Sequence, residues 1–369
     1  MDLISNDYYI KIFNKEHIIL EEVYEISELT YTKTLNGIWK ASLTLPRSIK
    51  TTEDILQNNN HIEIYRRINE MNVYNQHISA REELLWWGVI YNSNPHTSFF
   101  TIDCFGYGRL IQDKLFTMYI RQDNNVFTGE YDKVLYNMLN VINNMYNTGV
   151  SQGTAHKNNL QTTRIINWND NFYDKLDEFT TDANYFWQID KNRKLNLYTS
   201  LGIDKTYYEI NSDINVNKTL SITSSGEIYN YIVAKNTYTD DSDIEHSIIA
   251  EAKDLNSIYK YGVFSKELVV NDIRLQSTLD KYVEDELNKC KNPLISISLN
   301  VSNCDTYLRD RKSVFDVEVG DNISLILKEI SLNTEIKIIE FTIDCKTETM
   351  NIELGNCMFR EESPKVYRF

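Results

Sequence analysis

The sequence predicts a mainly β fold that is interrupted by a small α+β segment. Short runs near both ends of the chain alternate apolar with polar residues, as half-buried strands do. Two stretches between residues 129 and 183 instead place apolar residues at helical spacing. The 369 residues are 42% hydrophobic and include 25 Tyr, which is a globular composition. A chain of this length has room for two or three domains.

The N-terminal third is expected to be rich in strands. Residues 39–45 alternate strictly, and Pro46 ends this run because proline has no N–H to donate to a neighbouring strand. Residues 84–91 are apolar on both faces, so they predict a strand that is covered on both sides. The polar cluster at residues 92–96 predicts a turn, after which residues 99–105 return as the hairpin partner.

The middle of the chain changes to helical periodicity. Apolar side chains recur at helical spacing over residues 129–147 and again over about residues 170–183. Either Asn169 or Asp170 is expected to cap the second helix. The polar stretch 148–159 contains two glycines and predicts a loop between the two helices.

A hairpin at residues 186–198 is expected to complete this small α+β part, and the chain then returns to strands over residues 215–270. An apolar stripe from Leu275 to Cys290 predicts one long helix, which Pro293 ends. Gly320-Asp321 predicts a hairpin-like turn. Short alternating strands at this spacing suit a small barrel or sandwich; they cover residues 295–301, 323–327 and 350–354.

Charge and cysteine content exclude several classes of protein. The net charge of −15 and the pI near 4.9 argue against a general phosphate-binding surface. Solubility is the simpler reason for the charge, and a channel wall that does not bind DNA is the second. Five cysteines without a CxxC pair predict reduced thiols in a protein folded in the cytosol. We expect no signal peptide and no membrane-spanning segment.

No residue constellation predicts a catalytic centre, a metal site or a cofactor site. The six histidines lack zinc-site spacing. The acidic run at residues 240–243 lacks the Gly and the Glu of an EF-hand loop. Phe105-Gly106-Tyr107-Gly108 has no third glycine at dinucleotide spacing. Trp86 and Trp87 favour core or interface anchors over a sugar-binding platform.

Several glycines and their neighbours are expected to define the fold. Gly88 predicts either a bulge or a close backbone approach, and Gly106 and Gly108 predict a positive φ or a tight turn. The residues that we expect to define the fold are Trp86, Trp87, Gly88, Gly106, Gly108, Gly320, Asp321 and Gly355.

The order of these short signals resembles the hub proteins at the distal tip of bacteriophage tails. The resemblance covers about residues 1–356 of this chain. The similar proteins include the N-terminal part of siphophage tail-associated proteins and myophage baseplate hubs. Arg193 stands near the place of the usual hairpin glycine. The signals are Trp87-Gly88-Val89-Ile90, Gly106-Tyr107-Gly108-Arg109-Leu110, the turn Asp190–Leu195, the helix Arg274–Cys290 with Pro293, Val319-Gly320-Asp321 and the hairpin Ile336–Gly355.

The resemblance implies a division of the chain and an assembly. Residues 1–115 and 206–356 would each form a β-barrel-like hub domain, the second with one long helix. Residues 116–205 would form a small α+β domain, and residues 357–369 a C-terminal tail. Three copies would then assemble into a trimeric ring with pseudo-sixfold symmetry, because each chain contributes two related domains.

The resemblance also implies a structural, non-enzymatic role. The ring would join the sixfold tail tube or distal tail protein to the threefold tip, and it would let DNA pass on infection. The tape measure protein is a further expected partner, as is a separate tip spike, fibre or lytic protein, which residues 357–369 are expected to contact. The expected location is the virion tail tip, after assembly in the cytoplasm of the bacterial host.

Three alternatives remain open from the sequence. The first is the hub of a bacteriocin or of another contractile injection system. The second is a cell-wall hydrolase that uses surface carboxylates, and the third is a glycan-binding adhesin that uses Trp86 and Trp87. Peptidoglycan turnover would favour the hydrolase, whereas glycan-dependent protection of tryptophan fluorescence would favour the adhesin.

Overall fold

The structure of the chain is a computed structural model. It describes residues 7–48, 52–71, 77–116, 126–167, 169–224, 228–239, 245–270, 273, 275–292, 295–302 and 314–355. The acidic run at residues 240–243, Pro293 and the C-terminal tail at residues 357–369 lie outside the described residues. The expectations placed on them therefore stay predictions.

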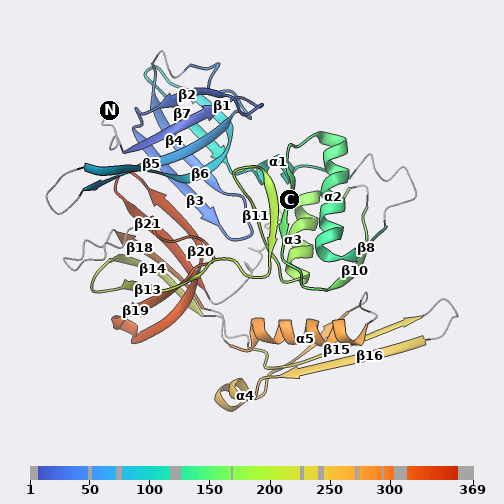
Figure 1. Cartoon of the computed structure of the whole chain (residues 1–369). Helices are drawn as coiled ribbons and strands as arrows, with labels where there is room; N and C mark the ends of the chain where they lie inside the picture. Colours follow the sequence, from blue (N-terminus) through green and yellow to red (C-terminus); the bar gives the residue numbers. More distant parts are fainter. Residues whose placement is uncertain are drawn as a thin grey trace, which may run out of the picture.

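One large sheet dominates the described chain (Figure 1). Its strands run in the order β14-β18-β21-β20-β3-β4-β7-β6-β5-β1-β2; off this order, β19 pairs with β20, and β13 pairs with β19. All neighbours in it are antiparallel except β13 and β19. The strands are β1 (Tyr8–Phe13), β2 (Ile19–Val23), β3 (Glu28–Thr34), β4 (Lys40–Pro46), β5 (His61–Met71), β6 (His77–Pro95), β7 (Phe99–Phe105), β13 (Asp204–Asn211), β14 (Val216–Ser224), β18 (Ile295–Ser302), β19 (Asn322–Leu327), β20 (Leu332–Asp344) and β21 (Thr349–Gly355).

The mainly β prediction is confirmed, together with the expected alternation of residues. Leu43 in β4 and Leu299 in β18 are completely buried, and both belong to a core that spans the whole sheet. The predicted turn at residues 92–96 is wrong in part, because Asn92–Pro95 continue β6 and pair with Phe100–Asp103 of β7. The chain turns at residues 96–98, where His96 N donates to Phe99 O at 2.8 Å. Turn-forming residues are tolerated in Asn92–Pro95 since the other edge of this segment pairs with no strand of the described chain.

The two halves of the large sheet follow one plan. The group β3-β4-β7-β6 and the group β14-β18-β21-β20 have the same chain order and the same neighbours. Both carry a register shift at the equivalent place, between Ile90 and Asn92 in β6 and between Ile338 and Glu340 in β20. The β14–β18 ladder has two further shifts, which precede Ser221. The chain therefore contains an internal structural repeat of four strands.

Hydrogen bonds before β5 and β19 repeat in the same way. Asn59 N donates to Ile90 O at 2.8 Å, and Gly320 N donates to Ile338 O at 2.8 Å. Ile90 N donates to Asn60 O at 2.9 Å, and Ile338 N donates to Asp321 O at 2.9 Å. Asn59 and Gly320 both have a positive φ, of 68° and 89°. These shared bonds fix the residue-by-residue match between the two halves.

An α+β segment with its own core follows β7, and both predicted helices are confirmed in it. The predicted loop 148–159 contains a strand, β9, because β12 supplies a parallel partner from a distant part of the chain. The second helix is capped by Asn171 rather than by Asn169 or Asp170. The elements are α1 (Arg109–Gln112), β8 (Val126–Glu130), α2 (Tyr131–Tyr146), β9 (Ser151–Ala155), β10 (Gln161–Ile165), α3 (Phe172–Asp182), β11 (Phe186–Ile189) and β12 (Lys194–Tyr198).

A smaller three-stranded sheet lies between β14 and β18 in the sequence. The predicted long helix is confirmed as α5 (Gln276–Cys290), which covers one face of this sheet (Figure 1). Leu279, Val283 and Leu287 of α5 form a separate core with Ile232 and Ala234. The other elements are β15 (Tyr231–Thr239), β16 (Glu245–Lys253), α4 (Leu255–Tyr261) and β17 (Ser265–Val269); the 3-10 turn η2 (Lys328–Ile330) follows β19.

The expected hairpin-like turn at Gly320-Asp321 needs qualification. Gly320-Asp321 forms a turn, in which Asp321 N donates to Glu318 O at 3.1 Å. The turn joins no hairpin, because residues 314–319 form no strand and β19 pairs with β13 and β20.

In the part of the chain that the structure describes, no helix combines the length and apolar character needed to cross a membrane.

Candidate functional site

The two adjacent tryptophans of β6 differ in the cores that they contact: Trp86 lies in one core, and Trp87 packs against two. Successive side chains of a strand point to opposite faces, so Trp86 enters the core of the large sheet and is completely buried. Trp87 packs against the core of the α+β segment as well. The prediction that β6 is covered on both sides is thus confirmed. The burial of Trp86 removes it from any sugar-binding face.

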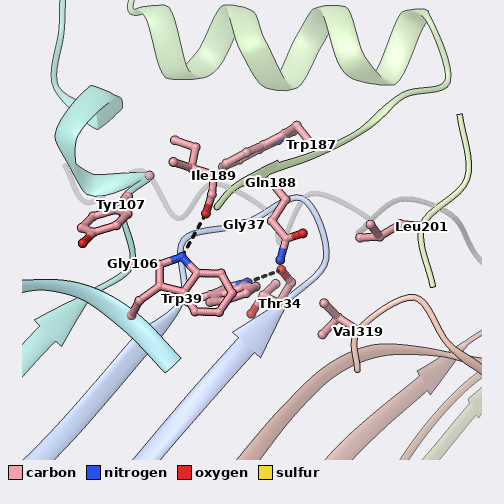
Figure 2. A pocket seen from close by; sticks show the side chains of 12 residues that line it. Thr34, Gly37, Trp39, Gly106, Tyr107, Trp187, Gln188, Ile189, Leu201 and Val319 are labelled. Atoms are coloured by element: carbon pink, nitrogen blue, oxygen red, sulfur yellow. Dashed lines mark hydrogen bonds between the residues drawn. The ribbon is translucent and has the colours of Figure 1, made fainter. Parts of the chain in front are cut away.

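Trp87 lies at a junction where three parts of the chain meet. Its ring centroid lies 4.8 Å from that of Trp39, with an interplanar angle of 60°. Its Nε1 donates to Ile189 O of β11 at 3.2 Å, while Trp39 Nε1 donates to Thr34 O at 3.1 Å. Figure 2 shows both bonds beside a small cavity. The cavity is lined by Thr34, Gly37, Trp39, Trp87, Gly106, Tyr107, Gly108, Trp187, Gln188, Ile189, Leu201 and Val319.

A buried lysine closes this junction from the side of β3. Lys33 is 3% exposed, and its Nζ lies 4.9 Å from the Trp39 ring and 5.6 Å from the Trp87 ring. The same atom donates to Glu318 at 2.6 Å and 2.9 Å. Buried charges need such partners, and aromatic faces attract cations. Lys33 therefore ties β3 to the segment that precedes β19.

Close packing requires one of the predicted glycines, Gly88, and leaves little room for a Cβ at two others. A Cβ at Gly88 would lie 2.2 Å from Phe105 O, one at Gly106 would lie 3.0 Å from Trp39 Cβ, and one at Gly108 would lie 3.0 Å from Ile38 Cγ1. For Gly88 the close approach is therefore confirmed. Gly106 begins a tight turn, since Arg109 N donates to its carbonyl at 2.9 Å. Neither Gly106 nor Gly108 has a positive φ.

Gly320 and Asp321 hold a second crossing point. A Cβ at Gly320 would lie 2.7 Å from Leu201 O, and φ is +89°. The Asp321 carboxylate is buried and accepts from Ile203 N at 2.9 Å and from Glu318 N at 2.8 Å. It also pairs with Lys205 Nζ at 2.8 Å. Asp321, which the sequence placed in a hairpin-like turn, is thus a buried side chain that holds this turn in place.

Lys337 completes this crossing. Its Nζ donates to Gly320 O at 3.0 Å and to Leu201 O at 3.2 Å. Burial lowers the pKa of Lys337, and the nearby Asp321 charge opposes that shift. Gly355, the last residue of β21, lies opposite Lys337. The fold-defining role of Gly355 stays a prediction.

Sequence reasoning missed the partners of the tryptophans. Lys33, Trp39 and Trp187 come from separate segments, so only the tertiary fold brings them together. It also missed His61, which is 3% exposed and lies 3.1 Å, Nδ1 to Oη, from Tyr107. Burial, followed by the charges of Arg193 and His17, lowers the pKa of His61 to about 4. His61 alternates with Ile62 and Ile64, which places it on the opposite face of the strand, so no local signal indicated its burial.

The arrangement can hold three segments together by packing and paired charges. Within the described ranges, no group of three or more His, Cys, Asp or Glu side chains is placed to hold a metal ion. The predicted residues divide between the two crossing points, with Trp87, Gly106 and Gly108 at the first and Gly320 and Asp321 at the second. Both are structural junctions.

Comparisons with known proteins identify relatives of this fold. The model of the prophage endopeptidase tail family matches residues 133–360. No curated protein sequence matches the chain. The prophage tail protein gp18 from Listeria monocytogenes EGD-e is 14% identical, with a TM-score of 0.64 over 96% of this chain and 95% of that one.

Two further solved structures have the same fold. A tail protein from Neisseria meningitidis MC58 is 10% identical, with a TM-score of 0.59 over 95% of this chain and 96% of that one. The 43 kDa tail protein of prophage MuSo2 from Shewanella oneidensis is 10% identical, with a TM-score of 0.56 over 94% of this chain and 97% of that one. At these identities the likeness establishes the fold.

Proposed function

Because the chain belongs to the prophage endopeptidase tail family, we propose that this phage-type tail protein is the hub of a tail tip. The observation that carries the proposal is the internal repeat of four strands, β3-β4-β7-β6 and β14-β18-β21-β20. A protein that joins a sixfold tube to a threefold tip needs two similar modules in each of three chains. The repeat supplies two such modules.

The proposed assembly is a homotrimer that forms a pseudo-sixfold ring. Each half of the large sheet would contribute one β-barrel-like domain to the ring, within residues 1–115 and 206–356. Residues 116–205 would form the small α+β domain between them. The fold-defining residues named above would then keep the two modules in their relative orientation, since Trp87 and Asp321 both sit where segments cross.

The proposed partners follow from the position of such a ring in a virion tail. The tail tube or distal tail protein would bind its sixfold side. The tip spike, fibre or lytic protein would bind its threefold side, and the tape measure protein and DNA would pass through the centre. The net charge of −15 suits a channel wall that repels DNA.

The test of this proposal is the solution mass of the purified full-length chain. Light scattering over a concentration series is expected to give three times the monomer mass of 43.4 kDa. Electron microscopy of the same sample is expected to show a ring with a central opening. A mass that stays monomeric at every concentration, or a compact particle without an opening, would contradict the proposal.

A second candidate function is cleavage of peptide bonds, which the description of the family suggests. We propose the structural role over it, because every predicted residue that the site brings together acts by packing or by tying segments. Incubation of the chain with peptidoglycan and with peptidoglycan-derived peptides separates the two. A structural hub releases no fragments, whereas time-dependent release of new amino termini would support an endopeptidase.

A further inference from the structure

A seam inside the chain joins the two halves of the large sheet. β20 pairs antiparallel with β3, and Glu340–Asp344 lie opposite Thr30–Thr34. Thr32 Oγ1 and Thr342 Oγ1 lie 2.7 Å apart, and Thr34 Oγ1 donates to Glu340 Oε2 at 2.6 Å. Tyr31 and Phe341 are 3% and 2% exposed. Backbone pairing, a polar ladder and apolar burial therefore act together at this seam.

The seam pairs β3 of one half with β20 of the other. The equivalents of these two strands, β14 and β6, do not pair with each other. β14 is the equivalent of β3, and it lies at one end of the sheet. β6 is the equivalent of β20. Beyond Ile90, its edge away from β7 pairs with no strand in the part of the chain that the structure describes. The chain thus carries one completed seam and the two halves of a second one.

Exposure of apolar side chains marks both unused edges. Tyr31 is 3% exposed at the seam, whereas Ile222, its equivalent in β14, is 41% exposed. Ile339 is 9% exposed, whereas Tyr91, its equivalent in β6, is 47% exposed. Tyr31 packs in the core of the large sheet and Ile339 packs against Leu35 and Phe186, whereas Ile222 and Tyr91 lie where no strand of the described chain pairs with their edge. An unpaired edge of this kind favours pairing with another chain.

The repeat also fixes the register that a second seam would have. The shared register shift makes Asn94 the equivalent of Thr342, since both follow it by the same number of residues. Pairing with β18 and β4 makes Thr223 the equivalent of Thr32. Asn94 would therefore lie opposite Thr223, and Ser93 opposite Ser224. These residues are uncharged, so no like charges would meet across the ladder.

We propose that β6 of one copy pairs antiparallel with β14 of the next copy, with Asn94 opposite Thr223. This inference rests on the trimeric hub proposed above and assigns its subunit contact. Six strands separate β14 from β6 within one sheet, so the contact joins different surfaces of neighbouring copies, head to tail. Pro95 has no N–H to donate and ends the ladder.

A designed disulfide tests the register directly. We introduce Asn94→Cys together with Thr223→Cys in the full-length chain and oxidise it. The Oγ1 atoms of the equivalent pair inside the chain lie 2.7 Å apart, so the two sulfurs are expected to reach bonding distance. Non-reducing electrophoresis is expected to show linked dimers and trimers, with no larger closed species.

Three controls accompany the disulfide. Thr32→Cys with Thr342→Cys is expected to form a bond inside one chain, which shows that the seam geometry accepts cysteines. Asn94→Cys with Asn217→Cys places the second thiol out of register on β14, and it is expected to give no linked chains. The unmodified chain reports the background from its own five cysteines.

A charge substitution gives an independent readout. Ile222→Asp places a carboxylate in the proposed contact, and the trimer fraction at a fixed concentration is expected to fall at least tenfold. The matched control is Ile249→Asp, because Ile249 is also on an edge strand, β16, and is 58% exposed. Circular dichroism is expected to be unchanged in both variants.

The outcomes separate this inference from the proposed function. A stable trimer that forms no Asn94–Thr223 link and tolerates Ile222→Asp overturns the seam and leaves the hub proposal standing. A chain that stays monomeric and unlinked at every concentration overturns both. Linked trimers that are lost on Ile222→Asp, but kept on Ile249→Asp, support both.

Discussion

Burial changes the role of individual polar residues in this protein. Asp321 reads as a turn residue in the sequence, yet its carboxylate is buried and accepts two backbone N–H groups. Lys33 is in phase with the buried residues Leu29 and Tyr31 along β3, and this charged side chain is itself 3% exposed and pairs with Glu318. In both cases a distant segment supplies the partner that offsets the cost of desolvation.

His61 provides a test at the scale of one residue. Its pKa is lowered to about 4, while an unfolded histidine has a pKa of about 6.5. Below pH 6.5 the unfolded chain binds a proton that the folded chain does not. The contribution of His61 to stability is therefore complete above pH 6.5 and is lost as the pH falls toward 4, by up to about 3 kcal/mol.

The measurement is urea unfolding at pH 7.0 and pH 4.5 for the wild type and for His61→Gln. We expect the wild type to lose more free energy of unfolding between these values than the variant, by about 2–3 kcal/mol. His156→Gln is the control, because His156 is exposed, and it is expected to keep the wild-type pH dependence. Identical pH dependence for wild type and His61→Gln would contradict the buried, neutral state of His61.

At the scale of elements, the periodicity of apolar residues predicted helices and strands well, whereas turn-forming residues predicted turns and loops less well. The helices α2, α3 and α5 and the strands β4, β7, β18, β19 and β21 fall where alternation or helical spacing predicted them. The turn at residues 92–96 and the loop at residues 148–159 were wrong in part, because β7 and β12 impose pairing on residues with weak strand preference. Pairing partners lie outside any local window of sequence.

The crossing of the two segments around Gly202 and Gly320 gives a prediction at this scale. Gly320→Ala is expected to lower the free energy of unfolding by about 2–4 kcal/mol, because the new Cβ adds a clash with Leu201 to the strain of a positive φ. Gly262→Ala is the matched control. Gly262 also has φ +89°, with ψ 175°, and no atom lies within 4 Å of a Cβ there, so Gly262→Ala reports backbone strain without a clash, about 1–3 kcal/mol.

Chemical denaturation monitored by tryptophan fluorescence measures this difference. Equal midpoints for the two alanine variants would mean that the segments do not approach closely at Gly320. A larger loss for Gly262→Ala would reverse the assignment. Either result would remove the crossing as a determinant of the fold.

At the scale of the whole molecule, the insertion between β14 and β18 is separable from the large sheet. Ser224 and Ile295 at its two ends lie directly opposite each other in the β14–β18 ladder. Its core of β15, β16 and α5 residues forms a separate cluster. Replacing residues 225–294 with Asn-Gly is expected to leave the large sheet folded, since this pair favours a two-residue hairpin turn.

Cooperative unfolding of the shortened chain, at a midpoint close to the wild-type value, is the expected result. The double variant Leu279→Ala and Val283→Ala is the control, because it empties the core of the insertion and leaves its length unchanged. It is expected to add an early transition without moving the main one. A shortened chain that aggregates or loses its cooperative transition would show that the insertion supports the large sheet.

The sequence by itself determined the fold class, most of the helices and strands, and the resemblance to phage tail proteins. Alternation and helical spacing are local properties, so the strands around Leu43, Leu299 and Ile352 and the helix that contains Val283 follow from them. The buried partners of Trp87 and Asp321 do not, because Ile189 and Lys205 come from distant segments. The internal repeat was also decided only in three dimensions. Asn59 and Gly320, or Asn94 and Thr342, are equivalent in hydrogen bonding and register but unlike as residues, since backbone pairing constrains geometry more than side-chain identity.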